Sequence, residues 1–270
     1  MLCNIVRVCV ILVVCLSFTK SEPLSGKHVK RVAQHDLDFV ASIAYQSTSG
    51  SHRKDNHICS GTLISPRHIL THERCLLNKI REHLAIYVGS PDIKSASPYH
   101  ACKWISYSSW YSENTNRFVN IGGSHIAIIT ICMNVVPAIA VPAPISPLTY
   151  DELEGSGVTV AGWGLLKDGS KSSYLKKATV KLLTQNTCNE FHHFETQERD
   201  RYLCTRSSPY VIVKPGDAGG PILDTKKRVI GVTSGSFWHG RSNDPEDAIN
   251  IHVNISYYRT FIQETTGLVF

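Results

Sequence analysis

The sequence predicts an all-β domain, on three observations. Runs of apolar and β-branched residues, four to eight long, recur along the chain and are separated by turn residues, which is typical of short strands. Long amphipathic helical patterns are scarce, and a short segment near Tyr257–Glu264 is the one candidate helix. About 240 residues follow the N-terminal region, enough for one domain with a substantial core.

The first 21 residues have the layout of a secretory signal peptide. Arg7 precedes an apolar run, Val8 to Phe18, and small residues up to Ser21 follow it. The apolar run has 11 residues, whereas a helix needs about 20 to span a bilayer. We therefore expect a secreted protein without a membrane span, with residues 22–31 as a short pro-segment and residues 32–270 as the folded domain.

The strand patterns fall into two groups on either side of a proline-rich segment. They are Leu37–Ala44, Leu84–Val88, Ile126–Ile131, Val158–Ala161, Val180–Leu183, Val229–Thr233 and Ile249–Ile255. Residues 135–144 contain three prolines and cannot form a central strand, because proline lacks the N–H that a sheet requires. We expect this segment to connect two halves of the domain.

The cysteine count and the net charge limit which compartment and which partners are expected for this protein. Three of the nine cysteines lie in the predicted signal peptide, and the remaining six form an even set, which in a secreted chain predicts three disulfides. Loss of residues 1–31 removes five of 28 basic and one of 22 acidic residues, leaving a net charge of +2. That charge does not favour nucleic acid or an anionic membrane as a partner.

The segment Lys214-Pro215-Gly216-Asp217-Ala218-Gly219-Gly220-Pro221-Ile222 resembles the Gly-Asp-Ser-Gly-Gly-Pro loop of chymotrypsin-like serine proteases. Further stretches resemble the same family in the same order. They are His57–Ile64, Thr71–Cys75 (Thr-Ala-Ala-His-Cys in the family), Ser124–Ile128 (Asn-Asp-Ile-Ala-Leu), Val160–Gly164 (Val-Thr-Gly-Trp-Gly) and Ile255–Ile262. The resemblance implies two six-stranded antiparallel barrels, at about 32–136 and 145–255, a short C-terminal helix, and a cleft between the barrels.

Carried onto this chain, the family's catalytic histidine, aspartate and serine fall on Arg74, His125 and Ala218. A guanidinium does not accept a proton near neutral pH, and a methyl group does not attack a carbonyl. We also expect the ring of His72 to point away from the cleft, because residues two apart on a turn do not face the same way. The amides of Gly216 and Ala218 are expected to retain an oxyanion hole. The resulting expectation is that the chain is not an enzyme.

The resemblance places the specificity pocket at Ile212, Ser236 and Asn250, where Asn250 is expected to narrow or plug it; an ordinary apolar or small pocket is the alternative. Lys214 stands where the family usually has a cysteine, so the disulfide that braces this pocket is expected to be absent. The resemblance pairs Cys59 with Cys75 and Cys188 with Cys204. Pairing of Cys102 with Cys132 is a hypothesis from their expected positions on adjacent strands.

Arg31-Val32 resembles the family's activation junction, where cleavage frees an amino group that pairs with the aspartate corresponding to Asp217. Removal of a pro-segment at a dibasic site, or no cleavage, are the alternatives. Asn254-Ile255-Ser256 is a glycosylation sequon that lies in a predicted strand. His192 and His193, with Glu190 and Glu195, do not have the spacing of a defined metal site, so we expect no metal and no cofactor.

The resemblance implies a function exerted by binding. We expect a secreted, monomeric, catalytically inactive homologue of the arthropod type found in venoms and reproductive secretions. Its expected partners are extracellular proteins, above all proteases or zymogens of a cascade such as melanisation in innate immunity. Two alternatives remain: an adhesion or toxin-like binding module, and a hydrolase with a non-standard nucleophile.

Overall fold

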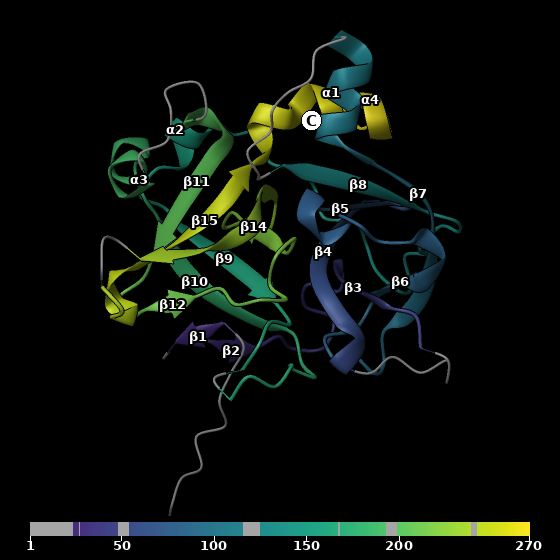
Figure 1. The fold of residues 1–270 in the computed structure, drawn as a ribbon, viewed down its shortest axis with the longest axis horizontal. Coiled ribbons are helices and arrows are strands. Elements are labelled where there is room, and N and C mark those ends of the chain that lie inside the picture. Colours follow the sequence, from purple (N-terminus) through teal and green to yellow (C-terminus); the bar gives the residue numbers. More distant parts are fainter. Residues whose placement is uncertain are drawn as a thin grey trace, which may run out of the picture.

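The computed structural model describes residues 24–26, 28–47, 54–115, 125–166, 168–192, 199–238 and 242–270. The predicted signal peptide lies outside these ranges. Among the described residues, no helix is long and apolar enough to cross a membrane. The strands form two barrels that lie side by side, the first at the right and the second at the left of Figure 1.

The first barrel is closed by six antiparallel strands in the order β3-β4-β5-β8-β7-β6. The strands are β3 (Val40–Tyr45), β4 (His57–Ser65), β5 (His68–His72), β6 (Leu84–Val88), β7 (Ser97–Ser106) and β8 (Ile126–Ile131). Strand β8 is buried at all six positions, as its run of apolar and β-branched residues predicts for a strand covered on both faces. One face fills the barrel, and the other packs toward the second barrel and the C-terminal helix.

The second barrel follows the order β11-β15-β14-β13-β9-β10 and closes through β10 and β11. These strands are β9 (Gly157–Gly162), β10 (Lys176–Leu182), β11 (Tyr202–Arg206), β13 (Pro221–Leu223), β14 (Val229–Trp238) and β15 (Ala248–Asn254). Two short N-terminal strands attach to it. Strand β1 (Ser25–Gly26) pairs with β12 (Val211–Ile212), and β2 (Lys30–Arg31) pairs with β10. This architecture confirms the predicted fold of two six-stranded barrels.

Helices are short and lie at the periphery. They are α1 (Tyr107–Thr115), α2 (Tyr150–Leu153), α3 (Gln185–His192) and α4 (Arg259–Thr266), with 3₁₀ turns η1 (Lys54–Asn56), η2 (Glu73–Cys75), η3 (Arg81–His83), η4 (Arg199–Arg201), η5 (Pro245–Asp247) and η6 (Ile255–Tyr258). The predicted C-terminal helix is present as η6 and α4. Figure 1 shows α1 and α4 side by side at the same end of the molecule, where the Trp110 and Phe261 rings are 5.5 Å apart.

Three disulfides and the proline-rich connector hold the barrels in shape. The disulfides join Cys59 to Cys75, Cys102 to Cys132 and Cys188 to Cys204, which are the expected pairs. Each closes a loop of 16 to 30 residues, worth about 3 to 4 kcal/mol in the chain-entropy model. The connector runs between the barrels, where the Ala143 amide donates to Leu63 and the Pro144 carbonyl accepts from Val229.

Candidate functional site in the cleft between the barrels

A pocket of about 580 Å³ opens between the two barrels. Both barrels line it, the first through β4 and η2 and the second through the loop after β12 and through β14. The lining residues are Ile58, Cys59, Arg74, Cys75, Leu77, Lys79, Val213, Lys214, Pro215, Gly216, Ala218, Ser234, Gly235, Ser236 and Trp238. Three of these side chains are cationic, and none is acidic.

A larger hollow of about 760 Å³ lies elsewhere, between α1, β7 and the end of α4. Its lining includes three carboxylates, Glu73, Glu113 and Glu264, and two tryptophans. None of the residues that the sequence analysis placed in the active site contributes to it. The cleft is therefore the candidate site.

The loop 214–220 is shaped by its glycines and by one buried carboxylate. Gly219 has φ +85°, and a Cβ placed there would lie 2.1 Å from the Ser60 carbonyl oxygen, so no larger residue fits. The Asp217 carboxylate is fully buried and accepts from the amides of Gly164 and Lys214, each at 2.7 Å. Desolvation raises the pKa of Asp217 to about 7.

The orientation of two amides of this loop follows from the carbonyls of their peptide units. The Pro215 carbonyl accepts from Leu165 at 2.9 Å, and the Asp217 carbonyl accepts from Gly220 at 3.0 Å. In a trans peptide the N–H points opposite to the carbonyl of the same unit. The N–H groups of Gly216 and Ala218 therefore point away from those partners, and both residues line the pocket. Their use as an oxyanion hole stays a prediction.

Arg74 extends its side chain across the cleft. It lies in η2, directly after β5, and its guanidinium donates to the Ser234 carbonyl on β14 of the other barrel. Burial lowers the pKa of Arg74, but a guanidinium remains protonated in a protein. Arg74 thus places a positive charge next to Ala218, whose own carbonyl accepts from the Ser60 amide at 2.8 Å.

His125 belongs to an aromatic cluster rather than to the pocket lining. Its Nδ1 is hydrogen-bonded to the Tyr258 hydroxyl at 2.8 Å, and its ring lies 5.5 Å from the Tyr107 ring. Burial, with a smaller effect from Arg201, lowers the pKa of His125 to about 4, so the ring is neutral at pH 7. The contacts of His125 connect the first barrel to η6 at the start of the C-terminal helix.

His72 does not line the pocket, as expected, but its ring contacts the second barrel. Its ring is fully buried, and its Nε2 lies 3.2 Å from the Ser234 hydroxyl in the second barrel. Nδ1 accepts from the Arg74 amide at 3.2 Å, so in the neutral ring Nε2 is protonated and donates to Ser234. His72 ends an extended strand and caps η2, and this strand-to-turn change brings both His72 and Arg74 to Ser234.

Sequence reasoning assigned no role to His57, which the structure places beside the glycine loop. Its Nδ1 is hydrogen-bonded to the Ser42 hydroxyl at 2.7 Å, and its Nε2 to the Gly216 carbonyl at 3.0 Å. Ser60 donates to the same carbonyl at 3.0 Å. These bonds fix the loop against the first barrel. The signal was its position two residues before Cys59 in a recognised motif.

The predicted pocket residues lie at the base of the loop. Asn250 is buried and crosslinks the walls: its Oδ1 accepts from the Val213 amide at 2.9 Å, and its Nδ2 donates to the Val211 carbonyl at 2.9 Å. The Ser236 hydroxyl donates to Asn250 Oδ1 and to the Val213 carbonyl. Ile212 is buried where β12 pairs with β1. That Asn250 narrows a specificity pocket stays a prediction.

The remaining predicted sites concern modification and metal. Asn254 is buried and caps η6, and its amide donates to the Asp200 carbonyl at 2.9 Å, which disfavours a glycan in the folded state. His193 and Glu195 lie outside the described ranges. Within the described ranges, no cluster of three histidine, cysteine or carboxylate groups could hold a metal ion.

The comparisons with known proteins cover nearly the whole chain. The sequence matches the family Trypsin over residues 28–262. The chain belongs to the trypsin family. It is 26% identical to trypsin alpha of Drosophila melanogaster over 95% of this chain and 96% of that protein, and 25% identical to trypsin beta of Drosophila erecta over 88% of each.

Solved structures show the same fold. Mouse neuropsin, a serine protease expressed in the limbic system of the brain, superposes with a TM-score of 0.69 at 20% identity, over 88% of this chain and 98% of neuropsin. The VesB protease of Vibrio cholerae superposes with the same TM-score and identity, over 89% of this chain and 68% of VesB.

These findings contradict the prediction that the chain is not an enzyme. The family match includes the segments that carry Arg74, His125 and Ala218, and the curated relatives named above are trypsins. The prediction equated three changed side chains with loss of activity. The structure has two hydrogen-bonded histidine–serine pairs, His57 with Ser42 and His72 with Ser234, and of these four residues Ser234 alone lines the described pocket. Three aligned positions do not decide the class of this protein, and it is classed with its family.

Proposed function

We propose that this trypsin-family protein is secreted and that its cleft binds an acidic segment of an extracellular protein. The observation that carries the proposal is the charge of the pocket, whose lining contains Arg74, Lys79 and Lys214 but no aspartate or glutamate. The three disulfides support secretion, because disulfides persist in oxidising compartments.

The positive groups surround an apolar surface with hydrogen-bond donors. Ile58, Val213 and Trp238 line the pocket beside the amides of Gly216 and Ala218. Trp238 is 40% exposed, which leaves ring surface for a ligand. An extended segment with an acidic side chain satisfies this lining, because the carboxylate meets the cations and the neighbouring backbone meets apolar surface.

The rim supports the same proposal. Lys79 donates to the Tyr45 hydroxyl at 2.7 Å, and its ammonium lies 5.0 Å from the Tyr45 ring centroid. Both side chains are at the surface, where Tyr45 is 46% exposed. A lysine held by an aromatic ring presents its charge at a fixed place, so less ordering entropy is lost on binding.

The partners that we propose are proteases and zymogens of an extracellular cascade. Melanisation is one such cascade. We propose that the protein acts there as a venom component or as an immune modulator. The resemblance to arthropod homologues supports this proposal, as do the Drosophila trypsins among the relatives. Capture of partners from extracellular fluid, followed by mass spectrometry, tests it. Enrichment of proteases or zymogens is expected, whereas enrichment of cell-surface proteins or glycans would favour an adhesion module.

Binding itself is tested with fluorescent peptides that differ only by exchange of Asp and Glu for Asn and Gln. We expect the acidic peptides to bind at least tenfold more tightly at low salt, and the difference to shrink as ionic strength rises. Lys214→Gln and Lys79→Gln should each weaken binding of the acidic peptide, whereas Lys94→Gln, at an exposed lysine outside the pocket, should not. Equal affinity for both peptide sets would refute the proposal. Mass spectrometry of the peptides after incubation separates binding from cleavage.

A further inference from the structure

A second hollow lies beside the cleft, and its lining is opposite in charge. It has a volume of about 760 Å³ and lies between η2, β7, α1 and the end of α4. Its described lining has three carboxylates, Glu73, Glu113 and Glu264, and one cationic side chain, Lys103. The lining of the cleft has three cations and no carboxylate. We call the second hollow the acidic hollow.

The turn η2 separates the acidic hollow from the cleft. Glu73 and Arg74 are consecutive in η2, yet Glu73 lines the acidic hollow and Arg74 lines the cleft. Leu77, which follows η2, lines both hollows and is 58% exposed. The two binding surfaces are therefore continuous, and a ligand in the cleft reaches the acidic hollow by passing over the Leu77 side chain.

The carboxylates of the acidic hollow keep oxygens for a ligand. Glu73 Oε2 accepts from the Ser108 hydroxyl at 2.8 Å, and Glu264 Oε2 accepts from Trp110 Nε1 at 3.1 Å. Within the described part of the chain, Oε1 of these two residues and both oxygens of Glu113 form no hydrogen bond or ion pair. Two carboxylates are thus held in place, and each of the three has at least one oxygen available.

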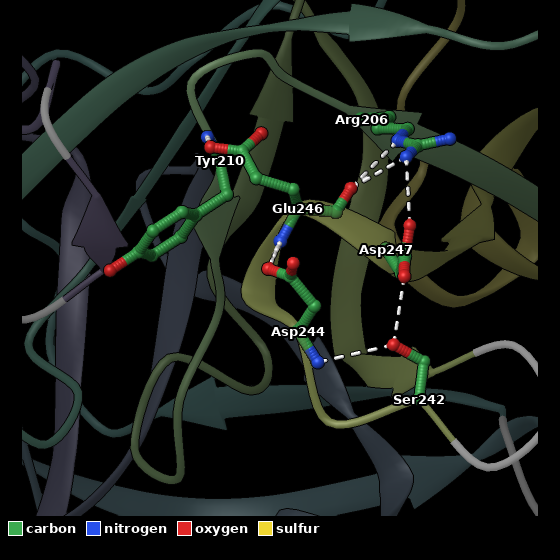
Figure 2. Close-up of polar contacts among 6 residues, drawn as sticks. All are labelled: Arg206, Tyr210, Ser242, Asp244, Glu246 and Asp247. Atoms are coloured by element: carbon green, nitrogen blue, oxygen red, sulfur yellow. Dashed lines mark hydrogen bonds and ion pairs between the residues drawn. The ribbon is translucent and has the colours of Figure 1, made fainter.

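A group of carboxylates in the second barrel shows the contrasting case (Figure 2). The Asp247 carboxylate lies 3.6 Å from the Arg206 guanidinium. The Glu246 carboxylate accepts from the Tyr210 amide at 3.2 Å, and the Asp244 carboxylate accepts from the Glu246 amide at 2.9 Å. Those three carboxylates hold the chain around η5 together, whereas the carboxylates of the acidic hollow leave Glu113 and two further oxygens unused.

The charge of the acidic hollow is distributed along it. Glu73, Glu113 and Glu264 come from three separate elements, η2, α1 and α4. Among the residues that the structure describes, they do not form a cluster that could hold a metal ion. Such a lining suits an extended ligand with a cationic side chain better than a single ion.

Two tryptophans supply the apolar part of the acidic hollow. Trp104 and Trp110 both line it and are partly exposed. The Trp110 ring is fixed beside Glu264 by its hydrogen bond and by the Phe261 ring, 5.5 Å away. An indole face attracts a cation, and the aliphatic part of a lysine or arginine side chain packs on apolar surface. Lysine and arginine therefore match both the charge and the aromatic surface of the hollow.

We propose that the segment bound by the cleft is bipolar, with an acidic side chain in the cleft and a lysine or arginine of the same segment in the acidic hollow. This inference rests on the proposed binding of an acidic segment, and it specifies the partner further as an extracellular protein segment with opposite charges on the two sides of Leu77. Since one chain carries both contacts, the second contact forms intramolecularly, at an effective concentration set by the residues between them.

The proposal is tested with three fluorescent peptides, measured by anisotropy on the intact protein. One is an acidic block, one is a lysine-containing block, and one joins the two blocks by a flexible linker of about two to six glycine and serine residues. A fourth peptide, with the lysines of the joined peptide replaced by glutamine, controls for length. We expect the joined peptide to bind about tenfold more tightly than either the acidic block or the glutamine control.

The outcomes separate this inference from the proposed function. If the acidic block binds and the joined peptide binds no more tightly than its glutamine control, the bipolar segment is refuted and binding in the cleft stands. If the acidic block does not bind, the proposed function and the bipolar segment both fail. Binding of the lysine block that does not strengthen binding of the joined peptide also overturns the bipolar segment, because the two hollows would then bind separate ligands.

Variants locate the basic contact. Glu113→Gln and Glu264→Gln should each reduce the advantage of the joined peptide over its glutamine control and leave the affinity for the acidic block unchanged. The glutamine at 264 keeps an oxygen that accepts from Trp110 Nε1, so the ring stays in place. Asp151→Asn, at an exposed carboxylate of α2 outside both hollows, is the matched control and should change neither affinity. Equal effects of Glu113→Gln and Asp151→Asn on the joined peptide would overturn the assignment of the acidic hollow.

Discussion

Asn250 offers the sharpest test of how the base of the cleft is held together. It is 1% exposed, and its side-chain amide joins two backbone groups on the neighbouring segment, the Val213 N–H and the Val211 carbonyl. Asn250→Ala removes both partners at once. The perturbation is therefore the loss of two buried backbone hydrogen bonds, with only a small change in apolar area.

The magnitude follows from the two groups left unpaired. Each buried N–H or carbonyl without a partner costs about 1 to 3 kcal/mol, which gives about 2 to 6 kcal/mol for the pair. The space left by the amide is polar, and a water molecule with two or more partners can enter it and recover part of this cost. We expect a loss of about 2 to 4 kcal/mol in the free energy of unfolding.

Urea unfolding followed by tryptophan fluorescence, with the disulfides intact, measures the effect through the midpoint at constant m. Asn56→Ala is a matched control, because the Asn56 amide makes a single bond at the surface, to the Tyr45 carbonyl, and should cost less than about 0.5 kcal/mol. If Asn250→Ala costs less than about 1 kcal/mol with an unchanged m, the crosslinking role of Asn250 is refuted.

Three further predictions follow from particular groups. Acidification should destabilise the protein below about pH 6.5, because burial lowers the pKa of His72 and His252 to about 3 and that of His125 to about 4. The unfolded chain then binds more protons than the folded chain, which costs up to about 2 kcal/mol of stability per histidine at pH 5. His252→Asn should make the slope of the free energy of unfolding against pH shallower. Replacing Cys102 and Cys132 together by alanine should cost about 3 to 4 kcal/mol in urea unfolding, from a 30-residue separation, and an unchanged midpoint would contradict this. Ala218→Ser should not raise amide hydrolysis above the wild-type rate in a chromogenic assay, because Arg74 does not accept the serine proton, and a large increase would refute this assignment of Arg74.

The fold could be predicted because its signals are local and repeated. The buried strand β8 is a run of apolar and β-branched residues, and the loop at 214–220 has glycines where its backbone requires them, as at Gly219. The family resemblance also indicated two of the three disulfides, and the expected adjacency of two strands indicated the third. These features depend on neighbouring residues and on strand adjacency, which a sequence pattern carries.

The site was predicted less well, because its contacts join distant segments. His72 and Ser234 are 162 residues apart, and the rule for neighbours on a turn, which kept the His72 ring out of the cleft, could not indicate this contact with the second barrel. The pro-segment boundary at residue 31 stays a prediction, and the sequence did not indicate that the Leu24 side chain is buried in the second barrel beside a strand pair of Ser25–Gly26 with β12. The class of protein was also misjudged, because the prediction rested on three side chains, whereas the family match covers residues 28–262.

The geometry of the cleft depends mainly on the backbone and little on the side chain of residue 218. The loop takes its shape from Gly219, which excludes any Cβ, from the buried Asp217, and from His57, which holds the Gly216 carbonyl. An alanine at 218 changes none of these, because its contribution to the fold is a carbonyl that accepts from the Ser60 amide. A chain can therefore change residue 218 and keep the conformation of this loop. The binding that we propose uses the cations of the pocket, Arg74, Lys79 and Lys214, so it is tested by the charge of the ligand rather than by the identity of one side chain.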